Sequence, residues 1–488
     1  MWLATTAHAV AETPRRLPPP SGVVDSATAM VAAEPVKAPA PFDQAPLDPI
    51  LVAAAPVDVA PVDVAPFDPA PFDPAVTPAA WLGTPPYRVE FVFDKGFGIV
   101  STDKAKTNSI YLGARVQQRY TGFTRDEQSF TDSTGATAPI NNRNVFDFER
   151  VRVNLQGTIL DPKLKYNMSF DGDSDGGATA DVLFFFFQYD ACDAAKLRIG
   201  RWRTIYGREW LLSSRYLRMA DRSMATEFFR PTFSDGLWLL GDPRPEWHYE
   251  LAVTNGFATS TRRPFQLDDD LAFSGTLRWD PLGPFGKGFQ DFDVHETPVA
   301  RLGVSGVFEK TDGRADIGFP LGDETSVLRL TDGTLISEVG ALAPGVQLQS
   351  LRVFQASVDA AMKYRGWSLG GEYFFRSLQD FTADGALPVT QINQRGYRVE
   401  GGMVLVPQRW DVNFQHSLVT GPAGTGFTHT FGVNYYLRGP DGPGTGDRLN
   451  KVTFDVTDVT SSPVTTTTAD LIAGDDGQLF RMQVQLGF

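Results

Sequence analysis

Hydrophobic and polar residues alternate in many short stretches of the chain after residue 108. The apolar positions are Leu164, Tyr166, Met168 and Phe170 in one stretch, Trp247, Tyr249, Leu251 and Val253 in a second, and Phe480, Met482, Val484, Leu486 and Phe488 in a third. A period of two puts the apolar side chains on one face of a β-strand and the polar side chains on the other. The pattern therefore predicts strands that are apolar on one face only.

The spacing of these strands distinguishes between two β-architectures. We predict sixteen strands, which start near residues 108, 144, 163, 181, 195, 236, 246, 271, 299, 350, 367, 394, 410, 427, 448 and 478. Long connections are expected at 122–143, 172–180, 204–235, 258–270, 310–349, 379–393, 420–426 and 457–477. The connections that alternate with these long ones are expected to be tight turns, except for two longer ones at about 280–298 and 438–447. Long loops at one end and short turns at the other are typical of an outer-membrane barrel and are not expected of a soluble sandwich.

The predicted fold is an all-β, 16-stranded antiparallel transmembrane β-barrel over residues 108–488, with residues 86–107 as a segment that enters it. No run of about 18 apolar residues is present for a membrane helix. A chain that spans a bilayer without helices must close its sheet into a barrel. We expect apolar side chains to face lipid, polar ones to face the lumen, and aromatic residues to form girdles at both interfaces. Sixteen strands leave room for an aqueous channel.

Residues 12–85 differ in composition from the rest. A five-residue unit recurs there, as in 55–59, 60–64, 65–69 and 70–74, and proline occupies its second position. Proline this dense removes backbone donors, so we predict a disordered linker. Residues 1–11 contain the small-x-small pattern Ala7-His8-Ala9 but no basic segment before it. They are either the remnant of an export signal or a coincidence.

Composition narrows the possible chemistry. The net charge of −14 argues against a nucleic-acid partner. The single cysteine, Cys192, allows no intramolecular disulfide and no cysteine-built metal site. The five histidines have no metal-ligand spacing, and the Asp171–Gly176 stretch favours a turn over a calcium loop. We predict no cofactor, no metal and no enzymatic activity, because no Ser/His/Asp arrangement is recognisable.

Residues 196–224 and two flanking segments contain motifs that point to a family. Motif-like segments are Gly200-Arg201-Trp202-Arg203, Ala220-Asp221-Arg222-Ser223, Val253-Thr254-Asn255-Gly256-Phe257 and the upstream Phe148-Glu149-Arg150-Val151-Arg152-Val153. Together they resemble the phosphate-selective porin O and P family, most clearly from about 145 to 257. Trp202 stands where that family has Phe, Arg203 where it has Lys, and Tyr206 near its Pro. The resemblance implies a sixteen-stranded, homotrimeric barrel and does not establish phosphate as the solute.

Basic residues are concentrated in residues 196–230, which contain nine basic and three acidic residues. This segment covers the end of the fifth strand and most of the third long loop, where porins commonly place their constriction. The candidate constriction residues are Lys196, Arg198, Arg201, Arg203, Arg208, Arg215, Arg218, Arg222 and Arg230. Arginine binds phosphate and carboxylate oxygens through a planar fork, so such a loop would favour anions. In the alternative interpretation, these residues pair with acids or lipopolysaccharide on the loop surface.

The expected function is a passive outer-membrane channel for small hydrophilic solutes, in particular anions such as phosphate. The expected partners are outer-membrane lipid, the anionic solute, two further copies of the chain, and barrel-assembly machinery that reads Phe488. Selectivity for cations, or only weak selectivity for either charge, remains an alternative, because residues 86–488 contain more acidic than basic residues. The alternative is a structural or cell-wall-anchoring barrel whose lumen is plugged by residues 310–349 or 86–105.

Overall fold

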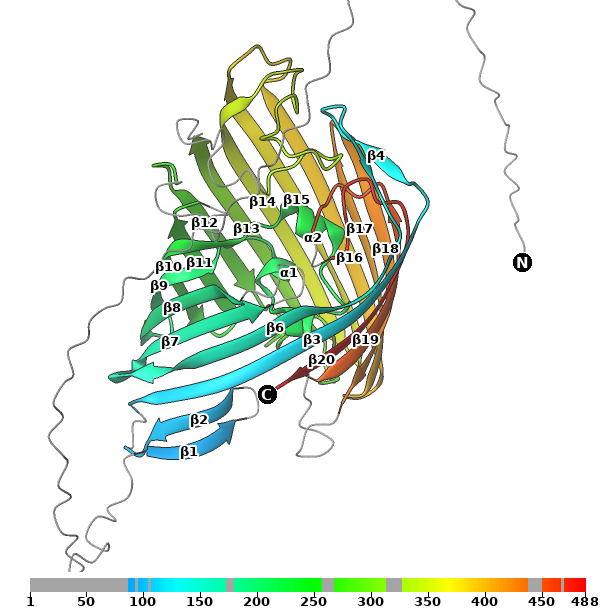
Figure 1. Cartoon of the computed structure of the whole chain (residues 1–488). Coiled ribbons are helices and arrows are strands. Elements are labelled where there is room, and N and C mark those ends of the chain that lie inside the picture. The colour runs from blue at the N-terminus through cyan, green and yellow to red at the C-terminus, as the bar shows by residue number, and fades with distance from the viewer. Residues whose placement is uncertain are drawn as a thin grey trace, which may run out of the picture. The chain divides into compact units, whose positions relative to one another are not determined.

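A closed ring of antiparallel strands makes up most of the chain (Figure 1). The computed structural model describes residues 87–92, 95–103, 107–172, 180–256, 267–312, 327–437, 450–466 and 469–488. The ring strands are β3 (Ser109–Arg125), β6 (Arg143–Ile159), β7 (Asp161–Gly172), β8 (Ala180–Cys192), β9 (Ala195–Arg203), β10 (Phe233–Arg244), β11 (Trp247–Thr254), β12 (Ala272–Trp279), β13 (Val299–Asp312), β14 (Leu348–Tyr364), β15 (Trp367–Ala383), β16 (Gln391–Val406), β17 (Trp410–Gly421), β18 (Gly424–Tyr436), β19 (Lys451–Thr460) and β20 (Gly477–Gly487). Each pairs with the next, and β20 pairs with β3 to close the ring.

The predicted sixteen-stranded barrel is thus confirmed, and every ring strand starts within three residues of its expected position. One predicted long connection, 420–426, is wrong. Strand β17 continues to Gly421, which pairs directly with Gly424 of β18, so only two residues make the turn. Gly424 has a φ of 151°, a conformation that side chains disfavour, and this lets the hairpin close tightly.

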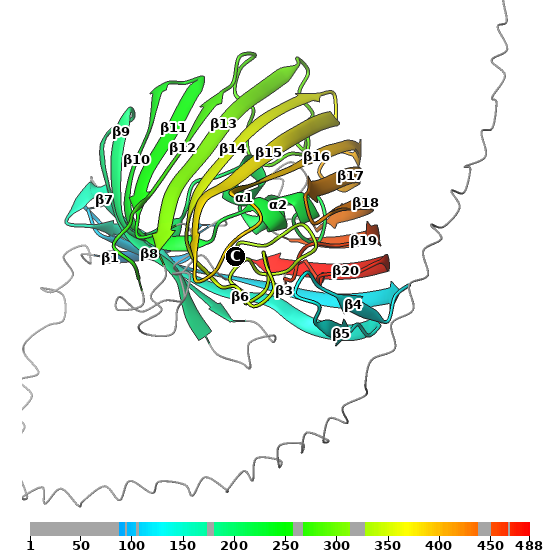
Figure 2. The same ribbon diagram turned by 90° about the horizontal axis from the view of Figure 1, so that it is seen from above.

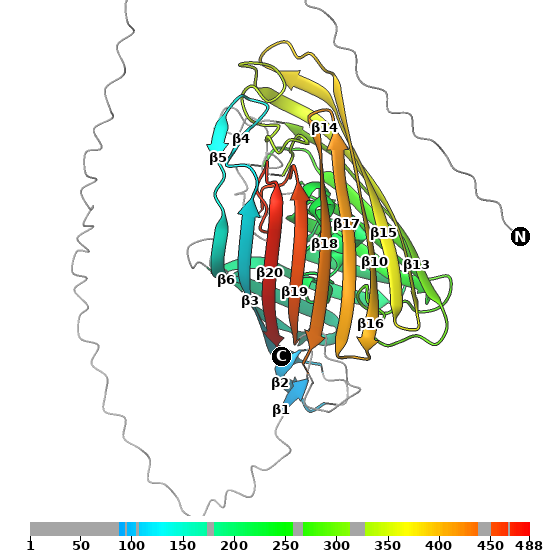
Figure 3. The ribbon, with the colours of Figure 1, turned by 90° about the vertical axis from the view of Figure 1, so that its right-hand side faces the viewer.

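The two faces of the strands are sorted as the alternation predicts. On β20, Phe480 and Leu486 are exposed on the outer surface, whereas Arg481, Gln483 and Gln485 are buried in the lumen. Apart from the turn between β17 and β18, the tight turns lie at one end of the barrel together with the C-terminal residue (Figure 3). This end is the periplasmic one in barrels of this type. Aromatic residues gather there, with Trp247 stacked on Trp279 across β11 and β12, which fits an interfacial girdle.

A hairpin of β1 (Tyr87–Val92) and β2 (Gly96–Ser101) precedes the ring and lies at its periplasmic end (Figure 3). Strand β2 pairs with the first residues of β3, which β20 does not reach. The hairpin therefore continues the sheet beside β3 where β20 has ended. The expected entering segment, 86–107, therefore contributes two strands that are not part of the ring. Residues 1–11 and the proline-rich residues 12–85 lie outside the described residues.

The lumen is less polar than predicted. An apolar cluster fills it toward the end with the long loops, and it includes Phe229, Leu330, Ile336, Leu351 and Leu471. The cluster combines wall residues with side chains of three connections that fold inward, whose described residues are 204–232, 327–347, 461–466 and 469–476. Residues 327–347 fall within one predicted plug, 310–349, whose residues 313–326 lie outside the described part. The other predicted plug, 86–105, contributes the β1–β2 hairpin at the barrel's end. The connection from β3 to β6 carries a hairpin of β4 (Ser129–Thr131) and β5 (Thr137–Pro139).

Candidate functional site

The connection from β9 to β10, residues 204–232, folds into the ring and is called the inner loop here. It carries α1 (Arg208–Leu211), the 3₁₀ turn η2 (Ser214–Tyr216) and α2 (Met224–Phe229), and Figure 2 shows α1 and α2 inside the circle of strands. Ser223 caps α2 by accepting a hydrogen bond from Thr226 N. The Ser223 hydroxyl in turn donates to Glu209 Oε2 at 2.7 Å, which ties the start of α2 to α1.

Buried ion pairs fix the inner loop to opposite sides of the wall. Asp221 accepts from Arg119 of β3 at 3.0 Å and from Arg150 of β6 at 2.7 Å. On the other side, Arg218 lies 3.3 Å from Glu400 of β16 and donates to Asn413 Oδ1 of β17 at 3.0 Å. Since all these side chains are buried, the loop position is set by charge pairing on both flanks.

Five of the nine candidate constriction residues have carboxylate partners within 3.5 Å. The pairs are Lys196–Asp242 at 2.8 Å, Arg201–Asp235 at 2.9 Å, Arg208–Asp359 at 3.4 Å, Arg218–Glu400 at 3.3 Å and Arg230–Glu227 at 2.8 Å. A paired guanidinium or ammonium attracts a passing anion less than an unpaired one, because its charge is largely compensated nearby. These five residues are not gathered around a common cavity: only Arg208 lines either of the two cavities described below.

The other four have different partners. Arg198 donates to Gln188 and stacks on Phe186 and Trp202. Arg222 donates to backbone carbonyls of Glu209 and Leu212, with Asp221 3.9 Å away. Arg203 donates to the carbonyl oxygens of residues 210–212. Arg215 donates to Ser213 Oγ at 3.4 Å and lies over the ring of Tyr216, 5.5 Å from its centroid. Burial lowers the pKa of Arg222 to about 10, so it stays charged at neutral pH.

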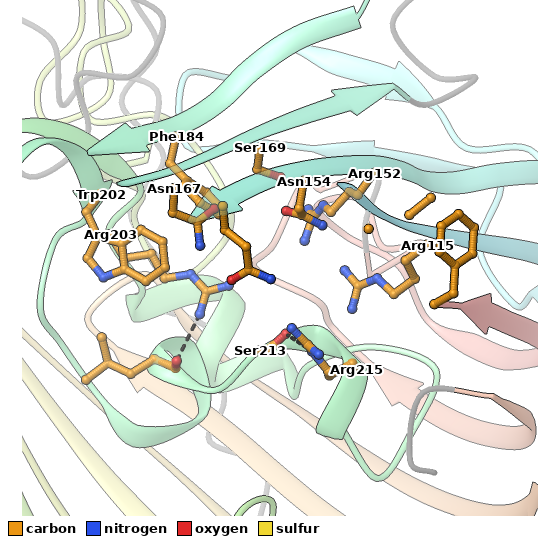
Figure 4. Close-up of a pocket in the computed structure, with 15 residues that line it drawn as sticks. Arg115, Arg152, Asn154, Asn167, Ser169, Phe184, Trp202, Arg203, Ser213 and Arg215 are labelled. Atoms are coloured by element: carbon orange, nitrogen blue, oxygen red, sulfur yellow. Dashed lines mark hydrogen bonds between the residues drawn. The ribbon is translucent and has the colours of Figure 1, made fainter. Parts of the chain in front are cut away.

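A cavity of about 200 Å³ lies between the inner loop and the wall of β3 and β6–β9. Four arginines line it, and their guanidinium groups point into the same space (Figure 4): Arg115 of β3, Arg152 of β6, Arg203 of β9 and Arg215 of η2. Of these, Arg203 and Arg215 were among the sequence candidates, whereas Arg115 and Arg152 were missed. Their signal was available, since each occupies a lumen-facing position in a strand beside the inner loop.

Electrostatics in this arginine cavity favour a negative occupant. No aspartate or glutamate side chain is among the described residues that line it. Arg152 is paired with Asp171 just outside, at 2.9 and 2.6 Å, while Arg115 donates to Ser214 Oγ at 2.9 Å. Four guanidinium groups in a partly enclosed space, with one carboxylate nearby, leave a surplus of positive charge.

Polar atoms in the lining are also unsatisfied. Arg203 Nε, Asn167 Oδ1 and Ser169 Oγ are buried and have no hydrogen-bond partner within the described part of the chain. All three residues line the arginine cavity. Buried polar atoms in folded proteins are usually paired with protein, water or ligand. The cavity is therefore suited to a small hydrophilic molecule that supplies both donors and acceptors.

A second cavity, of about 310 Å³, adjoins the first. Leu211 and Ser213 of the inner loop line both. The second cavity contains four basic residues, Arg208, Arg278, Lys287 and Arg301, and two acidic ones, Glu250 and Asp359. Both cavities thus carry a basic surplus, and together they follow the wall from β3 past β9 to β13.

Other candidate chemistry is sparse in the described residues. The carboxylates of Asp269, Asp270 and Asp312 lie close together, but Lys310 bonds to both Asp270 and Asp312 and compensates part of their charge. The proposed Asp171–Gly176 turn lies mostly outside the described residues. No helix in the described ranges has the length and apolarity to cross a bilayer. Phe488, the expected assembly signal, extends β20, and its backbone pairs with Ala114 of β3.

Comparison with known proteins gives one family. The sequence model of "phosphate-selective porin O and P" matches residues 125–278, which confirms the resemblance seen in the motifs. The match covers β6 to β12 and includes the whole inner loop. Together with the closed sixteen-stranded ring, it supports a porin-type channel in the bacterial outer membrane rather than an enzyme. No curated protein matches the chain.

Several solved structures are similar in outline. A loop L8 deletion mutant of OmpT, an outer membrane protein of Vibrio cholerae, matches with a TM-score of 0.47 and 10% identity, over 78% of this chain and 100% of that one. OmpF of Salmonella typhi, in complex with daunomycin, matches with a TM-score of 0.46 and 11% identity, over 78% of this chain and 98% of that one. OprB of Pseudomonas putida matches with a TM-score of 0.44 and 10% identity, over 78% of this chain and 94% of that one. The family match, and not these likenesses, bears on function.

Proposed function

We propose that this porin-type barrel is a passive channel for small anions, phosphate among them, and that the arginine cavity is its filter. The observation that carries the proposal is the convergence of Arg115, Arg152, Arg203 and Arg215 on one space beside the inner loop. Arg115, Arg152 and Arg203 come from wall strands, and Arg215 comes from the inner loop. Their planar forks donate paired hydrogen bonds to the oxygens of phosphate or carboxylate.

The inner loop narrows the lumen and so brings a passing solute into contact with the arginines. Selectivity in such channels is set by the charges at the narrowest point. An anion in this cavity replaces part of its hydration with guanidinium groups, whereas a cation meets four positive charges. Polar atoms such as Asn167 Oδ1 and Ser169 Oγ are placed to accept hydrogen bonds from a protonated phosphate oxygen.

In the cell we propose the partners that the family resemblance implies. The barrel would lie in outer-membrane lipid as a homotrimer, and barrel-assembly machinery would read the strand that ends in Phe488. The segment of residues 12–85 would act as a linker at the periplasmic end.

The test is the chloride current through the purified protein in a planar bilayer while inorganic phosphate is added. In the wild type, phosphate should compete for the arginine cavity and reduce the chloride current. In Arg115→Ala/Arg152→Ala and in Arg203→Ala/Arg215→Ala, phosphate should lose most of this effect. The matched control is Lys196→Ala/Arg201→Ala, because these residues lie on β9 but pair with acids away from the cavity. Equal phosphate block in all variants would contradict the proposal.

A second function, the structural barrel with a plugged lumen, is favoured by one observation. Inward-folded connections fill the extracellular half of the lumen with the apolar cluster around Phe229 and Leu330. If correctly folded protein gives no current in any salt, the structural barrel is the better account.

A further inference from the structure

A second segment also enters the lumen, from the periplasmic end. Residues 280–298 connect β12 to β13 and are called the strap here. Most other connections at this end are tight turns, but the strap buries Phe285, Phe289, Asp291 and Phe292 to 0–3% exposure. A connection of 19 residues that buries its aromatic side chains in a barrel is folded inward and held there.

The strap is bonded to the wall on the side of β14 to β18. Lys363 of β14 donates to the carbonyl oxygen of Phe285 at 3.0 Å. Asp291 accepts from the backbone N–H of Gly366, in the turn between β14 and β15, at 2.7 Å. The ring of Phe292 packs edge-on against Tyr436 of β18 at 4.8 Å. These contacts span the β14–β18 side of the lumen.

The strap is also bonded to the inner loop. Arg218 donates to the carbonyl oxygen of Phe289 at 2.9 Å, and Gln290 donates to that of Leu217 at 3.3 Å. The ring of Phe289 lies between two guanidinium groups, Arg208 at 4.6 Å and Arg398 at 4.7 Å. Stacked cations of this kind hold an aromatic ring in place. The strap and the inner loop therefore form one layer across the β14–β18 side.

The space that remains lies on the basic side. The arginine cavity follows β3 and β6–β9, and the second cavity follows β11–β13, where Gly286, Lys287 and Gly288 of the strap are part of its lining. Gly286 and Gly288 have φ values of 74° and 73°, which let the backbone bend sharply on both sides of Lys287. Arg278 Nε in the same lining is buried without a hydrogen-bond partner among the described residues.

We propose that the strap is a second selectivity element. It closes the β14–β18 side of the periplasmic exit, so that solute passes only along the basic wall, and it presents Lys287 to the second cavity in series with the arginine cavity. The inference rests on the proposed anion channel for its selectivity, but its effect on pore width is independent of the solute. If the strap were only a brace, its removal would lower stability without changing conductance.

The experiment replaces residues 283–296 by Gly-Ser-Gly. This variant keeps Asp280 and Arg301, whose two hydrogen bonds of 2.7 Å join the ends of the strap. Single-channel conductance in KCl should rise several-fold and anion selectivity should fall, because solute could then bypass the basic wall. The matched control is Leu282→Ala, which trims an exposed strap side chain and should leave both values unchanged. A folded shortened variant with wild-type conductance would overturn the proposal.

A second variant covers the case in which the shortened protein does not fold. Lys287→Glu changes an exposed side chain, so the barrel should assemble normally. Anion selectivity should fall while conductance stays within the same order. Unchanged selectivity would remove Lys287 from the proposal. If the wild type itself does not select anions, the proposed function fails, and the conductance of the shortened variant still decides whether the strap closes the lumen.

Discussion

Arg119 and Arg150 both donate to the carboxylate of Asp221, and all three side chains are buried. In contrast, the hydrogen bonds that Arg115 and Arg215 donate to side chains of the described residues go to hydroxyl groups and not to carboxylates. One residue type thus has two uses in this lumen. Arg119, Arg150 and Arg218, which have buried acidic partners, hold the inner loop in place, whereas Arg115 and Arg215 face the arginine cavity. Sequence alone could not separate the two groups, because the carboxylates that decide the matter come from distant strands and loops.

The anchoring use predicts a large effect for Asp221→Asn. Arg119 keeps Glu149 at 3.0 Å and Asp470 at 2.8 Å, and Arg150 keeps Glu149 at 3.2 Å. The substitution therefore weakens two buried, charge-assisted hydrogen bonds, which should lower the free energy of unfolding by about 1.5–3 kcal/mol. Thermal unfolding of the barrel in detergent measures this as a lower Tm. The control is Asp235→Asn, which breaks the partly exposed pair with Arg201 and should cost at most about 1 kcal/mol. Equal Tm values for the two variants would refute the anchoring role.

The same pair predicts a pH dependence. Burial alone would raise the pKa of Asp221, but the guanidinium groups of Arg150 and Arg119 hold it well below its usual range. A carboxylate with a depressed folded-state pKa stabilises above its unfolded-state pKa, and this stability is lost as the pH falls toward the folded value. The Tm difference between wild type and Asp221→Asn should therefore still be clear at pH 5. A difference that disappears by pH 5 would show that the carboxyl is protonated in the folded protein.

At the scale of elements, alternation and loop length predicted all sixteen ring strands, because burial of one face fixes both the period and the register. The errors occur where contacts between distant parts of the chain, and not the alternation of apolar and polar residues, determine the conformation. The pattern predicts a long loop at 420–426 where a two-residue turn is found, and it predicts an entering segment at 86–107 without the two strands of the β1–β2 hairpin. The sequence predicts the strap only as a longer connection, because nothing in it indicates that its aromatic residues turn inward. The basic residues of 196–230 do locate the inner loop.

Strand β20 allows a test of the assembly signal. Phe488 lies on the outer surface in phase with Phe480, and its ring packs edge-on against Phe97 of the hairpin, with 5.7 Å between the ring centroids. We expect Phe488→Ser to lower the amount of folded barrel recovered from cell membranes while leaving refolding in detergent micelles unchanged. Leu486→Ala, on the same face, is the control and should leave both unchanged. Parallel losses in cells and in micelles would indicate a role in stability instead.

At the scale of the molecule, one part of the outer face is unlike a lipid-exposed surface. His416 of β17 and His429 of β18 are direct cross-strand partners, with Nδ1 atoms 3.1 Å apart, and Tyr397 of β16 bonds to His416. These three residues share the outward face with Phe414 and Phe431. Polar groups that face hydrocarbon are costly, so we expect a neighbouring protomer to cover this face.

The expected trimer contact is tested by His416→Leu/His429→Leu. Leucine suits lipid as well as or better than histidine does, so the monomeric barrel should be at least as stable. The trimer should dissociate more readily, as measured by light scattering in detergent. Leu251→Ala on β11, at another part of the outer face, should have no effect. A trimer of unchanged stability would place the protomer contact elsewhere.

The measurement that tests the central claim most directly is the zero-current potential of the wild-type protein in a planar bilayer under a tenfold KCl gradient. Because both cavities are basic, we expect a potential whose sign shows that chloride is more permeant than potassium. This potential should collapse when Arg115, Arg152, Arg203 and Arg215 are replaced together by alanine. A potential of the sign that potassium sets, from open channels of wild-type protein, would contradict the anion filter.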